Sequence, residues 1–462
     1  MTQARIALVL AALAGLSACD ISQRLATAPT DPGNRFMALP ADAAATWPDP
    51  DWWRAFGSEE LDALILEAAA NNRDLEAAVQ RVAQAEAQTR ITRAALFPVI
   101  DADGGLSRGR SSSTNGNSRT RTSYSAAISA SYELDLAGEL ENLANASDTL
   151  LLATVYDRDA VTLTLTADTA NAYFTLLALR DRLALARDTL DAARRVQGIV
   201  RVQATAGQAS ELEVQQQLSA VKSQEAAVAG LEGDERRQAN ALALLLGRRP
   251  ETLSVAVPTL DRLQLPPIMA GLPSELLRRR PDLARAEADL AAAGFDAQAA
   301  RAARFPVVAL TVSGGLQSTE FSDLMSADGA IWSLAGAVTT PIFDAGRLEA
   351  GEDEAVARYQ ELAAVYSQSI LAALQDVENS LIAVQAAERT FALRRDAYIA
   401  AREAYRIAEL RWRTGATDFV SVLQAQQTSF TAADTLTQAD LARFTASVSL
   451  YRALGGGWNQ AG

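Results

Sequence analysis

The side chains that most often carry out enzyme chemistry are scarce in this sequence. Its 462 residues include no histidine and one cysteine. Without histidine there is no Ser-His-Asp or Cys-His pair and no imidazole to bind a metal. One cysteine supplies neither a thiolate zinc or iron–sulfur site nor an internal disulfide. The acidic residues are spaced as solvated helix faces, and no glycine-rich phosphate loop precedes a helix. We therefore expect no catalytic, cofactor or metal site.

The charge balance argues against a nucleic-acid partner. The chain has 42 Lys and Arg against 56 Asp and Glu, a net charge of −14, and an isoelectric point near 4.7. Binding to phosphates requires clustered basic residues instead. The four methionines give no methionine-rich relay of the kind that a copper or silver route uses, which argues against a dedicated soft-metal exporter.

The single cysteine, Cys19, ends an N-terminal export signal. An apolar run from Ile6 to Leu16 follows Arg5, is too short to span a bilayer, and leads into Leu16-Ser17-Ala18-Cys19. This pattern resembles a bacterial lipoprotein signal, which implies removal of residues 1–18 and covalent lipid on Cys19. The alternative is an ordinary secretory peptide with a chance cysteine. No later segment has about 18 unbroken apolar residues, so a chain that crosses a membrane must use a closed barrel.

A constant offset of 208 in residue number relates the two halves of the chain. The matched positions are Leu75 with Leu283, Phe97-Pro98-Val99 with Phe305-Pro306-Val307, Ala137-Gly138 with Ala345-Gly346, Gly207 with Gly415, and Leu246-Gly247 with Leu454-Gly455. Since the anchors are Phe, Pro and Gly, alignment of alanine-rich helices by chance does not explain them. The sequence therefore predicts an internal duplication.

The duplication sets the expected domain organisation. After the signal peptide, residues 19–58 form a lipid-anchored segment and residues 59–249 form the first repeat, with a hairpin at 99–135 and long helices at 141–246. A proline-rich connector follows at 250–273. The second repeat, residues 274–462, has a hairpin at 307–343 and long helices at 346–454. Each repeat begins with a helical stretch, Glu59 to Leu96 or Ser274 to Arg304, that ends at Phe-Pro.

Residues alternate between apolar and polar in the segments that follow Phe-Pro. From Tyr124 to Leu134 the even positions are apolar; Val308 to Ser313 alternates too, and a later strand is expected at Ile331 to Ile342. The paired strands are separated by turn-rich loops at 108–122, with Asn115-Gly116, and at 317–329. This order predicts two hairpins. A soluble sandwich and a transmembrane barrel both fit the alternation. Four strands cannot close a barrel, so a barrel needs several chains, and three copies give twelve strands.

Long helices with heptad spacing complete each repeat. Apolar residues step by four and three from Leu165 to Leu183 and from Ile370 to Val384. At ~1.5 Å per residue, the helices at 141–203 and 208–246 would be roughly 95 Å and 60 Å long, which predicts a rod or tube. We expect Gly207 and Gly415 to end one helix of each pair. Ser210 with Glu213, and Thr417 or Asp418, would cap the next helix.

Three motifs closely resemble the outer membrane factor family, the TolC-like efflux ducts: Asp51 to Gly57, Leu272 to Ala284, and Leu450 to Trp458. The lipoprotein signal points to the NodT-type branch. The resemblance implies a mainly α-helical fold with a transmembrane β-barrel: a homotrimer whose twelve-stranded barrel in the outer membrane continues into a periplasmic α-helical barrel. It also implies two partners, a periplasmic adaptor and an inner-membrane proton-driven pump, and no catalytic activity.

In that family the helix-turn tips meet the adaptor. The matching residues here are Ala206, Gly207, Ser210, Thr414, Gly415 and Ala416. Some members close the duct with acidic residues where this chain has Ser421 and Gln424, a departure from that version of the gate. Asp418 is the alternative source of an acidic ring, with Arg411 and Arg413 as partners. Asp418 is equally well explained as a helix cap.

Other functions stay open beside drug efflux. Asp20, directly after Cys19, resembles an inner-membrane retention signal of some enteric bacteria, which the expected barrel outweighs. A duct for type I protein secretion fits the same architecture. A coiled-coil envelope lipoprotein without transport would explain the heptads but not the alternating strands, and a passive porin would explain the strands but not the helices.

Overall fold

The computed structural model describes residues 25, 31–33, 36–37, 47–112, 118–267 and 273–458. Cys19, Asp20 and the Asn115-Gly116 turn lie outside these residues. The chain divides into two compact units. One consists of Met1–Pro29, Arg81–Val155 and Arg285–Ser367, and the other of Thr30–Gln80, Tyr156–Ala284 and Gln368–Gly462. Each unit takes segments from both halves of the sequence, so the units are not the two repeats.

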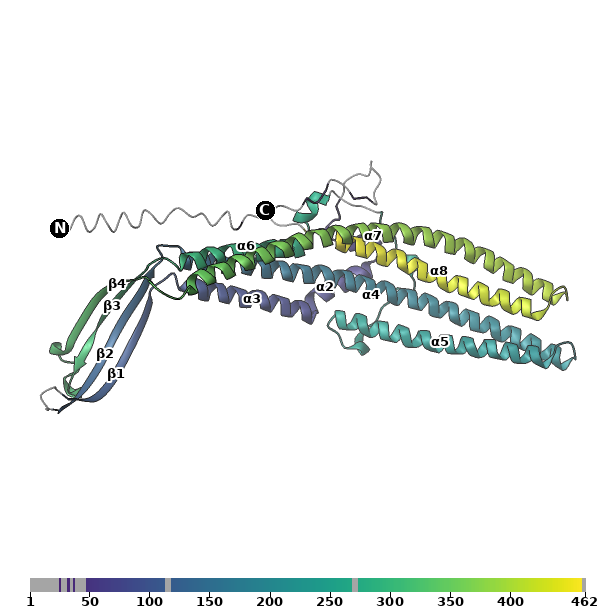
Figure 1. Cartoon of the computed structure of the whole chain (residues 1–462). Helices are drawn as coiled ribbons and strands as arrows, with labels where there is room; N and C mark the ends of the chain where they lie inside the picture. The colour runs from purple at the N-terminus through teal and green to yellow at the C-terminus, as the bar shows by residue number, and fades with distance from the viewer. Residues whose placement is uncertain are drawn as a thin grey trace. The chain divides into compact units, whose positions relative to one another are not determined.

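The elements follow the same order in both halves of the chain (Figure 1). The first half has α2 (Glu59–Asn71), α3 (Arg73–Ala94), β1 (Val99–Ser112), β2 (Ser118–Leu134), α4 (Glu139–Thr205) and α5 (Glu211–Leu245). The second half has α6 (Pro281–Ala302), β3 (Val307–Ser318), β4 (Ala330–Thr339), α7 (Arg347–Arg413) and α8 (Phe419–Ala453). Short 3-10 turns are η2 (Trp52–Phe56), η3 (Pro250–Thr252), η4 (Leu260–Arg262), η5 (Pro273–Arg278), η6 (Phe321–Asp323) and η7 (Ala327–Gly329). The expected mixture of long helices and hairpin strands is confirmed.

The offset between the repeats recurs in the boundaries of the elements. Both ends of α3, α4 and α5 are separated by this offset from the matching ends of α6, α7 and α8, and the start of β1 is separated by it from the start of β3 (307 − 99 = 208). Strand pairing repeats in the same way. Val99 lies opposite Ser131 in the first hairpin, and Val307 lies opposite Thr339 in the second. The two halves therefore share boundaries and strand register.

Two helix predictions were wrong, one by an internal break and one at its start. The single helix expected from Glu59 to Leu96 is broken at Asn72, whose side-chain oxygen accepts hydrogen bonds from the amides of Asp74 and Leu75 and starts a new helix. The helix expected from Ser274 begins at Pro281. Residue 280 precedes a proline, which disfavours helical dihedral angles there, and 3-10 turn η5 occupies residues 273–278.

The strands are longer or shorter than the alternation predicted. β2 starts at Ser118, ahead of the expected Tyr124, because pairing with β1 continues towards the turn. β4 ends at Thr339 rather than Ile342, since Pro341 cannot donate to a ladder of hydrogen bonds. The four strands form one antiparallel sheet in the order β1-β2-β3-β4.

A buried aromatic cluster holds the core of the second unit. Phe56 of η2 packs against Phe174 of α4 and Phe444 of α8, with ring centroids 4.9 and 5.9 Å away. Trp52 stacks on Tyr451 at 4.9 Å. These side chains are almost completely buried. Full burial of each aromatic ring is worth about 1.5–3 kcal/mol, so the cluster fixes η2 against two long helices.

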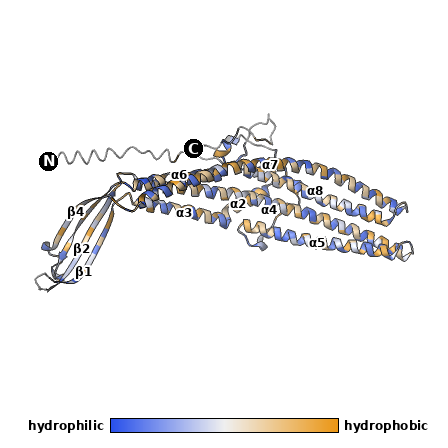
Figure 2. Ribbon diagram, viewed as in Figure 1, coloured by the Kyte–Doolittle hydropathy of each residue, from blue (hydrophilic) through white to orange (hydrophobic). Residues whose placement is uncertain are grey.

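The long helices have mixed surfaces along their length. Figure 2 shows hydrophobic and hydrophilic residues interleaved along α4, α5, α7 and α8. Leu179 and Leu183 of α4 pack with Leu231 of α5, and nearer the helix ends Leu190 packs with Val221. No helix among the described residues combines the length and the apolar character needed to cross a bilayer.

Candidate functional site

The sheet has one apolar and one polar face. Because side chains alternate and the strand register pairs even positions with even positions, the even residues of all four strands share a face. The apolar residues on that face are Ile100, Ala102, Leu106, Tyr124, Ala126, Ile128, Ala130, Tyr132, Leu134, Val308, Leu310, Val312, Leu316, Ala330, Trp332, Leu334 and Val338. The opposite face has mainly small and polar residues, among them Asp101, Asp103, Ser125, Ser129, Thr311, Ser313 and Ser333.

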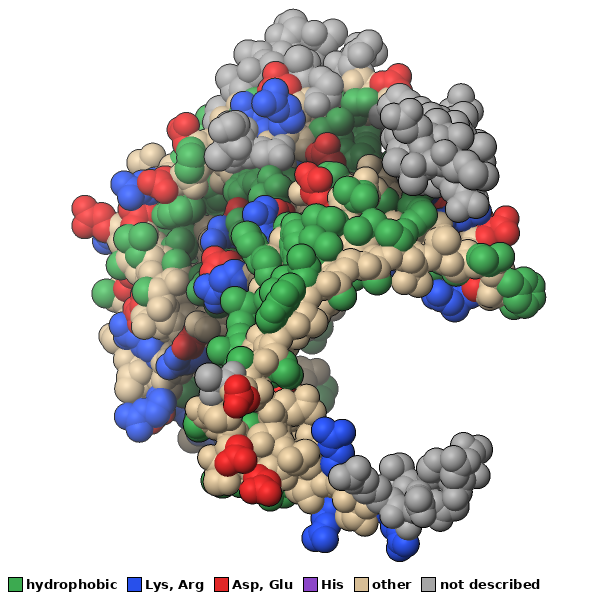
Figure 3. Space-filling view, turned by 90° about the vertical axis from the view of Figure 1, so that its left-hand side faces the viewer, with side chains coloured by type: hydrophobic (Ala, Val, Ile, Leu, Met, Phe, Trp, Pro, Cys, Tyr) green, Lys and Arg blue, Asp and Glu red, His purple; other side chains and the backbone are tan. Residues whose placement is uncertain are grey.

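This apolar face is uncovered in the single chain. Trp332 is 83 % exposed, Ile100 71 % and Ile128 62 %. Soluble monomers rarely leave a continuous apolar surface of this kind open to water, so the face marks a contact with a membrane or another protein. In Figure 3, viewed from the sheet end, the face turned to the viewer is hollowed on one side.

The two outer strands each lack a neighbour on one side. Within the part of the chain that the structure describes, β1 pairs only with β2 and β4 pairs only with β3. These edges are 14 and 10 residues long. Long open edges present rows of unpaired amide and carbonyl groups, which favour the addition of further strands.

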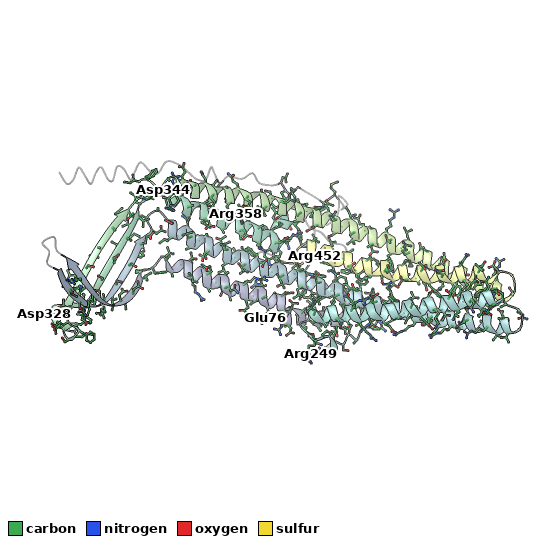
Figure 4. All side chains as sticks on the ribbon, turned by 60° about the horizontal axis from the view of Figure 1, so that its bottom comes forward. Glu76, Arg249, Asp328, Asp344, Arg358 and Arg452 are labelled. Carbon is green, nitrogen blue, oxygen red and sulfur yellow. The ribbon has the colours of Figure 1, made fainter. Side chains whose placement is uncertain are left out.

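Acidic residues lie at both ends of the second hairpin, and an aromatic contact joins its loop to the first hairpin. Asp328 lies at the loop end of the sheet and Asp344 at the start of α7 (Figure 4). Asp344 accepts hydrogen bonds from the amides of Gly346 and Leu348, and the Leu348 bond holds the pKa of this carboxyl below its usual value. At the loop end, Tyr124 packs edge-on against Phe321 with centroids 5.5 Å apart.

The α4–α5 turn has the geometry that the sequence predicted. Gly207 has φ of 73°, a left-handed conformation that residues other than glycine rarely adopt. Ser210 accepts a hydrogen bond from the amide of Glu213, and the Glu213 carboxylate accepts one from the amide of Ser210. This capping box starts α5. Ala206, Gly207 and Ser210 are all exposed.

The α7–α8 turn uses one of the two caps considered. Gly415 has φ of 73°, and Asp418 accepts a 2.7 Å hydrogen bond from the amide of Ser421. Asp418, rather than Thr417, is therefore the cap of α8. Thr414, Gly415 and Ala416 are exposed. Val196 and Val200 of α4 form a buried cluster with Phe419 of α8, which joins the two helix pairs close to their turns.

The three residues suggested for a gate have specific roles in the single chain. Arg413 forms a 2.6 Å ion pair with Glu409 one turn earlier in α7. The main-chain carbonyl of Arg411 accepts a hydrogen bond from the amide of Ala416, so this residue helps to close the turn. Asp418 serves as the cap of α8, and an acidic ring formed by several copies stays a prediction.

The cap at Asp418 is expected to weaken only in acid. The hydrogen bond from the Ser421 amide lowers the pKa of Asp418 below its ordinary 3.8. Stabilisation by the ionised cap is therefore present above pH 3.8 and lost as pH falls through the lower pKa of the folded chain. Hydrogen exchange in the first turn of α8, corrected for its intrinsic rate, should stay slow at pH 5 and become faster near pH 3. Asp418→Asn, which keeps a capping oxygen, should abolish this pH dependence; an unchanged dependence would contradict the assignment.

One junction was missed by sequence reasoning. Arg280 forms ion pairs with Asp282 at 2.6 Å and Asp376 at 3.3 Å, and it donates to the main-chain carbonyl of Ala453 at 3.2 Å. It thus joins the start of α6 to α7 and to the end of α8. The Arg-Arg-Arg-Pro run was the available signal, but it does not identify the distant partners.

Comparisons with known proteins give a consistent result. The family model described as outer membrane efflux protein matches residues 64–248 and 272–456, two ranges that are themselves offset by 208 (272 − 64 = 208). The pyoverdine export outer membrane protein OpmQ of Pseudomonas aeruginosa is 40% identical over 415 residues, which cover 88% of this chain and 87% of OpmQ. The cation efflux system protein CusC of Escherichia coli is 32% identical over 422 residues, 91% of each chain.

Two solved structures of outer membrane channels are also similar to this chain. The outer-membrane channel OprN has a TM-score of 0.87 and 28% identity, and the match covers 94% of this chain and 99% of OprN. A CusC structure has a TM-score of 0.82 and 31% identity over 93% of this chain and 98% of CusC. Fold and sequence therefore match outer membrane channels along almost the full length of the chain.

Proposed function

Because the chain belongs to the outer membrane efflux protein family, we propose that it is the channel component of a tripartite efflux system. The protein is an outer membrane protein that extends into the periplasm, and its family and relatives are channels rather than enzymes. In the proposed system, an inner-membrane pump driven by protons and a periplasmic adaptor deliver substrates to this duct. The observation that supports the proposal most is the exposed apolar face that spans all four strands.

The sheet supports a barrel made by three copies. An apolar face towards lipid and a polar face towards a channel are the pattern of transmembrane β-barrels. Four strands are too few to close, while three copies give twelve strands and leave no open edge. Tyr124, Phe321 and Trp332 lie towards the loop end of the sheet, where aromatic residues favour the boundary between lipid and water.

The helices support a conduit across the periplasm. α4 and α7 each have 67 residues, which is about 100 Å of helix at ~1.5 Å per residue. In the proposed homotrimer, α4, α5, α7 and α8 of three copies form a helical barrel continuous with the strand barrel. Three copies of Asp418 would then surround its narrow end, where like charges select cations.

The exposed turns at Gly207 and Gly415 are the proposed contacts with the adaptor. Gly415→Val should impair export without abolishing assembly, because valine at a positive φ is strained and its branched side chain alters the exposed turn. Gly198→Val is the matched control: Gly198 lies exposed in α4 with open space around its Cβ position and no positive φ. Export can be measured as dye retention, alongside crosslinking to the adaptor. Normal export in Gly415→Val would argue against docking at this turn.

Lipid on Cys19 is part of the proposal, although Cys19 and Asp20 lie outside the described residues. We propose that barrel assembly determines the final location and that Asp20 does not retain the protein in the inner membrane. Metabolic labelling with a clickable fatty acid, with Cys19→Ala as the control, tests the lipid. Recovery of the native protein in inner-membrane fractions would refute the proposed sorting.

The cargo depends on the pump in this proposal. Relatives are named for pyoverdine export, for cation efflux and for toluene efflux, so similar ducts serve chemically different cargo. Type I protein secretion is the alternative for the same architecture. The two differ in what accumulates when the gene is deleted: small molecules inside the cell, or an unexported protein.

A further inference from the structure

Two positively charged side chains share the apolar face of the sheet. Among the even positions of the four described strands, Arg108 and Arg110 of β1 are the only charged residues. Both are exposed, and the residues opposite them on β2 are Thr122 and Thr120. Successive residues on one face of a strand lie about 7 Å apart, so the two guanidinium groups can reach one ligand. The face is therefore apolar along most of its length and basic at the loop end.

The length of the apolar band places this basic pair at the edge of a hydrocarbon layer. The even residues of β2 are all apolar from Tyr124 to Leu134. Ten steps of ~3.4 Å make about 34 Å along the strand. A strand tilt of about 35–45° reduces this length to roughly 24–28 Å of height, which matches the apolar band of about 25 Å in transmembrane barrels. Arg108 lies opposite Thr122, the first position of this face beyond Tyr124.

The basic pair lies at the end of the sheet away from the helices. β2 ends at Leu134 and α4 begins at Glu139, so the helices continue from the other end. In the proposed conduit the helices lie in the periplasm, which puts the loop end in the outer leaflet of the membrane. Arg108 and Arg110 would then lie roughly 5 and 10 Å beyond the apolar band, at the level of the lipid head groups.

We propose that Arg108 and Arg110 bind the phosphate groups of lipid A, the phosphorylated glycolipid of the outer leaflet. Arginine donates paired hydrogen bonds to phosphate oxygens, and the hydroxyl groups of Thr120 and Thr122 supply further donors. The chain has a net charge of −14, so a basic pair on the lipid side provides local complementarity to an anionic leaflet. This assignment rests on the proposed function, which turns the apolar face to lipid, and adds the lipid that the face recognises.

A lipid is favoured over free phosphate because the apolar face begins directly beside the arginines. Leu106 is the next residue of β1 on this face, and it lies opposite Tyr124. Leu106 is 69 % exposed. One ligand that has both phosphate groups and acyl chains can therefore contact the basic pair and the apolar band together.

Carboxylates of the protein are the rival partners of these arginines. Glu320, Asp323 and Asp328 lie in the connection between β3 and β4, and Figure 4 shows Asp328 at the loop end of the sheet. Ion pairs with this connection in another copy would stabilise the assembly in any lipid. Binding to lipid phosphate instead requires a phosphorylated lipid. The two uses of the arginines therefore differ in their dependence on the lipid.

Lipid titration of the full-length protein in detergent tests the site. Arg108→Ser removes one positive charge from the lipid side, and Arg121→Ser is the matched control. Arg121 lies opposite Gly109, between Arg108 and Arg110 in height, but on the polar face of the sheet. Native mass spectrometry gives the affinity for diphosphoryl lipid A, and lipid A without its phosphates forms the second arm.

We expect Arg108→Ser to bind diphosphoryl lipid A about fivefold more weakly, and the double variant Arg108→Ser, Arg110→Ser about twenty-fivefold more weakly. Arg121→Ser should bind like the unmodified chain. Replacing both arginines with lysine keeps the charge but loses the paired hydrogen bonds, so this variant should bind with an affinity between those of the unmodified chain and the double serine variant. All variants should bind lipid A without phosphates equally.

The outcomes separate the site from the proposed function. Equal affinities of Arg108→Ser and Arg121→Ser for diphosphoryl lipid A would overturn the site and leave the conduit intact. So would an equal loss with and without the lipid phosphates, or a lower thermal stability of Arg108→Ser in phosphatidylcholine vesicles, since both assign the arginine to protein carboxylates. Failure of the unmodified chain to float with phosphatidylcholine vesicles would contradict the lipid-facing barrel, and the proposed function with it.

Discussion

Ile128→Arg is expected to prevent the protein from accumulating in the outer membrane, whereas Ser129→Arg, at the next position, should leave accumulation close to normal. Ile128 is 62 % exposed in the middle of the apolar face, and Ser129 points to the polar face. Arginine facing lipid near the bilayer midplane costs about 2–4 kcal/mol per chain, and in the proposed trimer three copies would bear this cost in one barrel. Arginine on the polar face stays in water.

Membrane fractionation and the detergent resistance of the folded protein provide the measurement. Both variants add the same charge to the same strand, so a difference between them reports the face and not the strand. Normal accumulation of Ile128→Arg would mean that the apolar face does not meet lipid. A loss in both variants would point to a general intolerance of charge in β2.

The second large effect is expected at Gly455, where α8 ends. Gly455 has φ of 85°, and a Cβ there would overlap the main-chain carbonyl of Arg279. Gly247, its counterpart in the first repeat, makes the same close approach to Asn71. Gly455→Ala combines a left-handed backbone with a clash against main chain that no side-chain movement relieves. We expect a loss of about 3 kcal/mol or more, enough to remove most of the folded protein.

Gly415→Ala is the control for that substitution. Gly415 has a similar φ of 73° but open space around its Cβ position, so the loss should be only about 1–2 kcal/mol. Thermal unfolding of the purified protein in detergent, followed by circular dichroism, compares the two. Equal shifts in the two variants would mean that backbone strain alone matters and that the contact with Arg279 is not tight.

Much of the fold follows from patterns in the sequence. The constant offset of 208 predicted the same order of elements in the two halves, and the alternation of apolar and polar residues predicted the hairpins. Both patterns depend only on the spacing of residues within one chain. The break at Asn72 was not predicted, since the surrounding residues favour helix and the break is marked by hydrogen bonds of one side chain, to the amides of Asp74 and Leu75. The late start of α6 was predictable from Pro281.

Some parts of the candidate site could be predicted from the sequence and others could not. The turn at Gly207 and the cap at Ser210 could be predicted because glycine and the Ser-x-x-Glu pattern act over a short stretch of chain. The junction at Arg280 could not, since its partners Asp376 and Ala453 lie far away in the sequence, on other helices. The proposed adaptor contacts and the proposed acidic ring at Asp418 would involve other chains, so they do not follow from the geometry of one chain.

Dye retention in the source organism, with the gene deleted and then restored, tests the central claim most directly. The proposed efflux role predicts that deletion raises the retained dye, that the intact gene restores export, and that Gly198→Val restores it equally well. Gly415→Val should restore assembly in the outer membrane but not export. If retention of dye is the same with and without the gene, while the protein is present in the outer membrane, the chain is not the efflux duct proposed here.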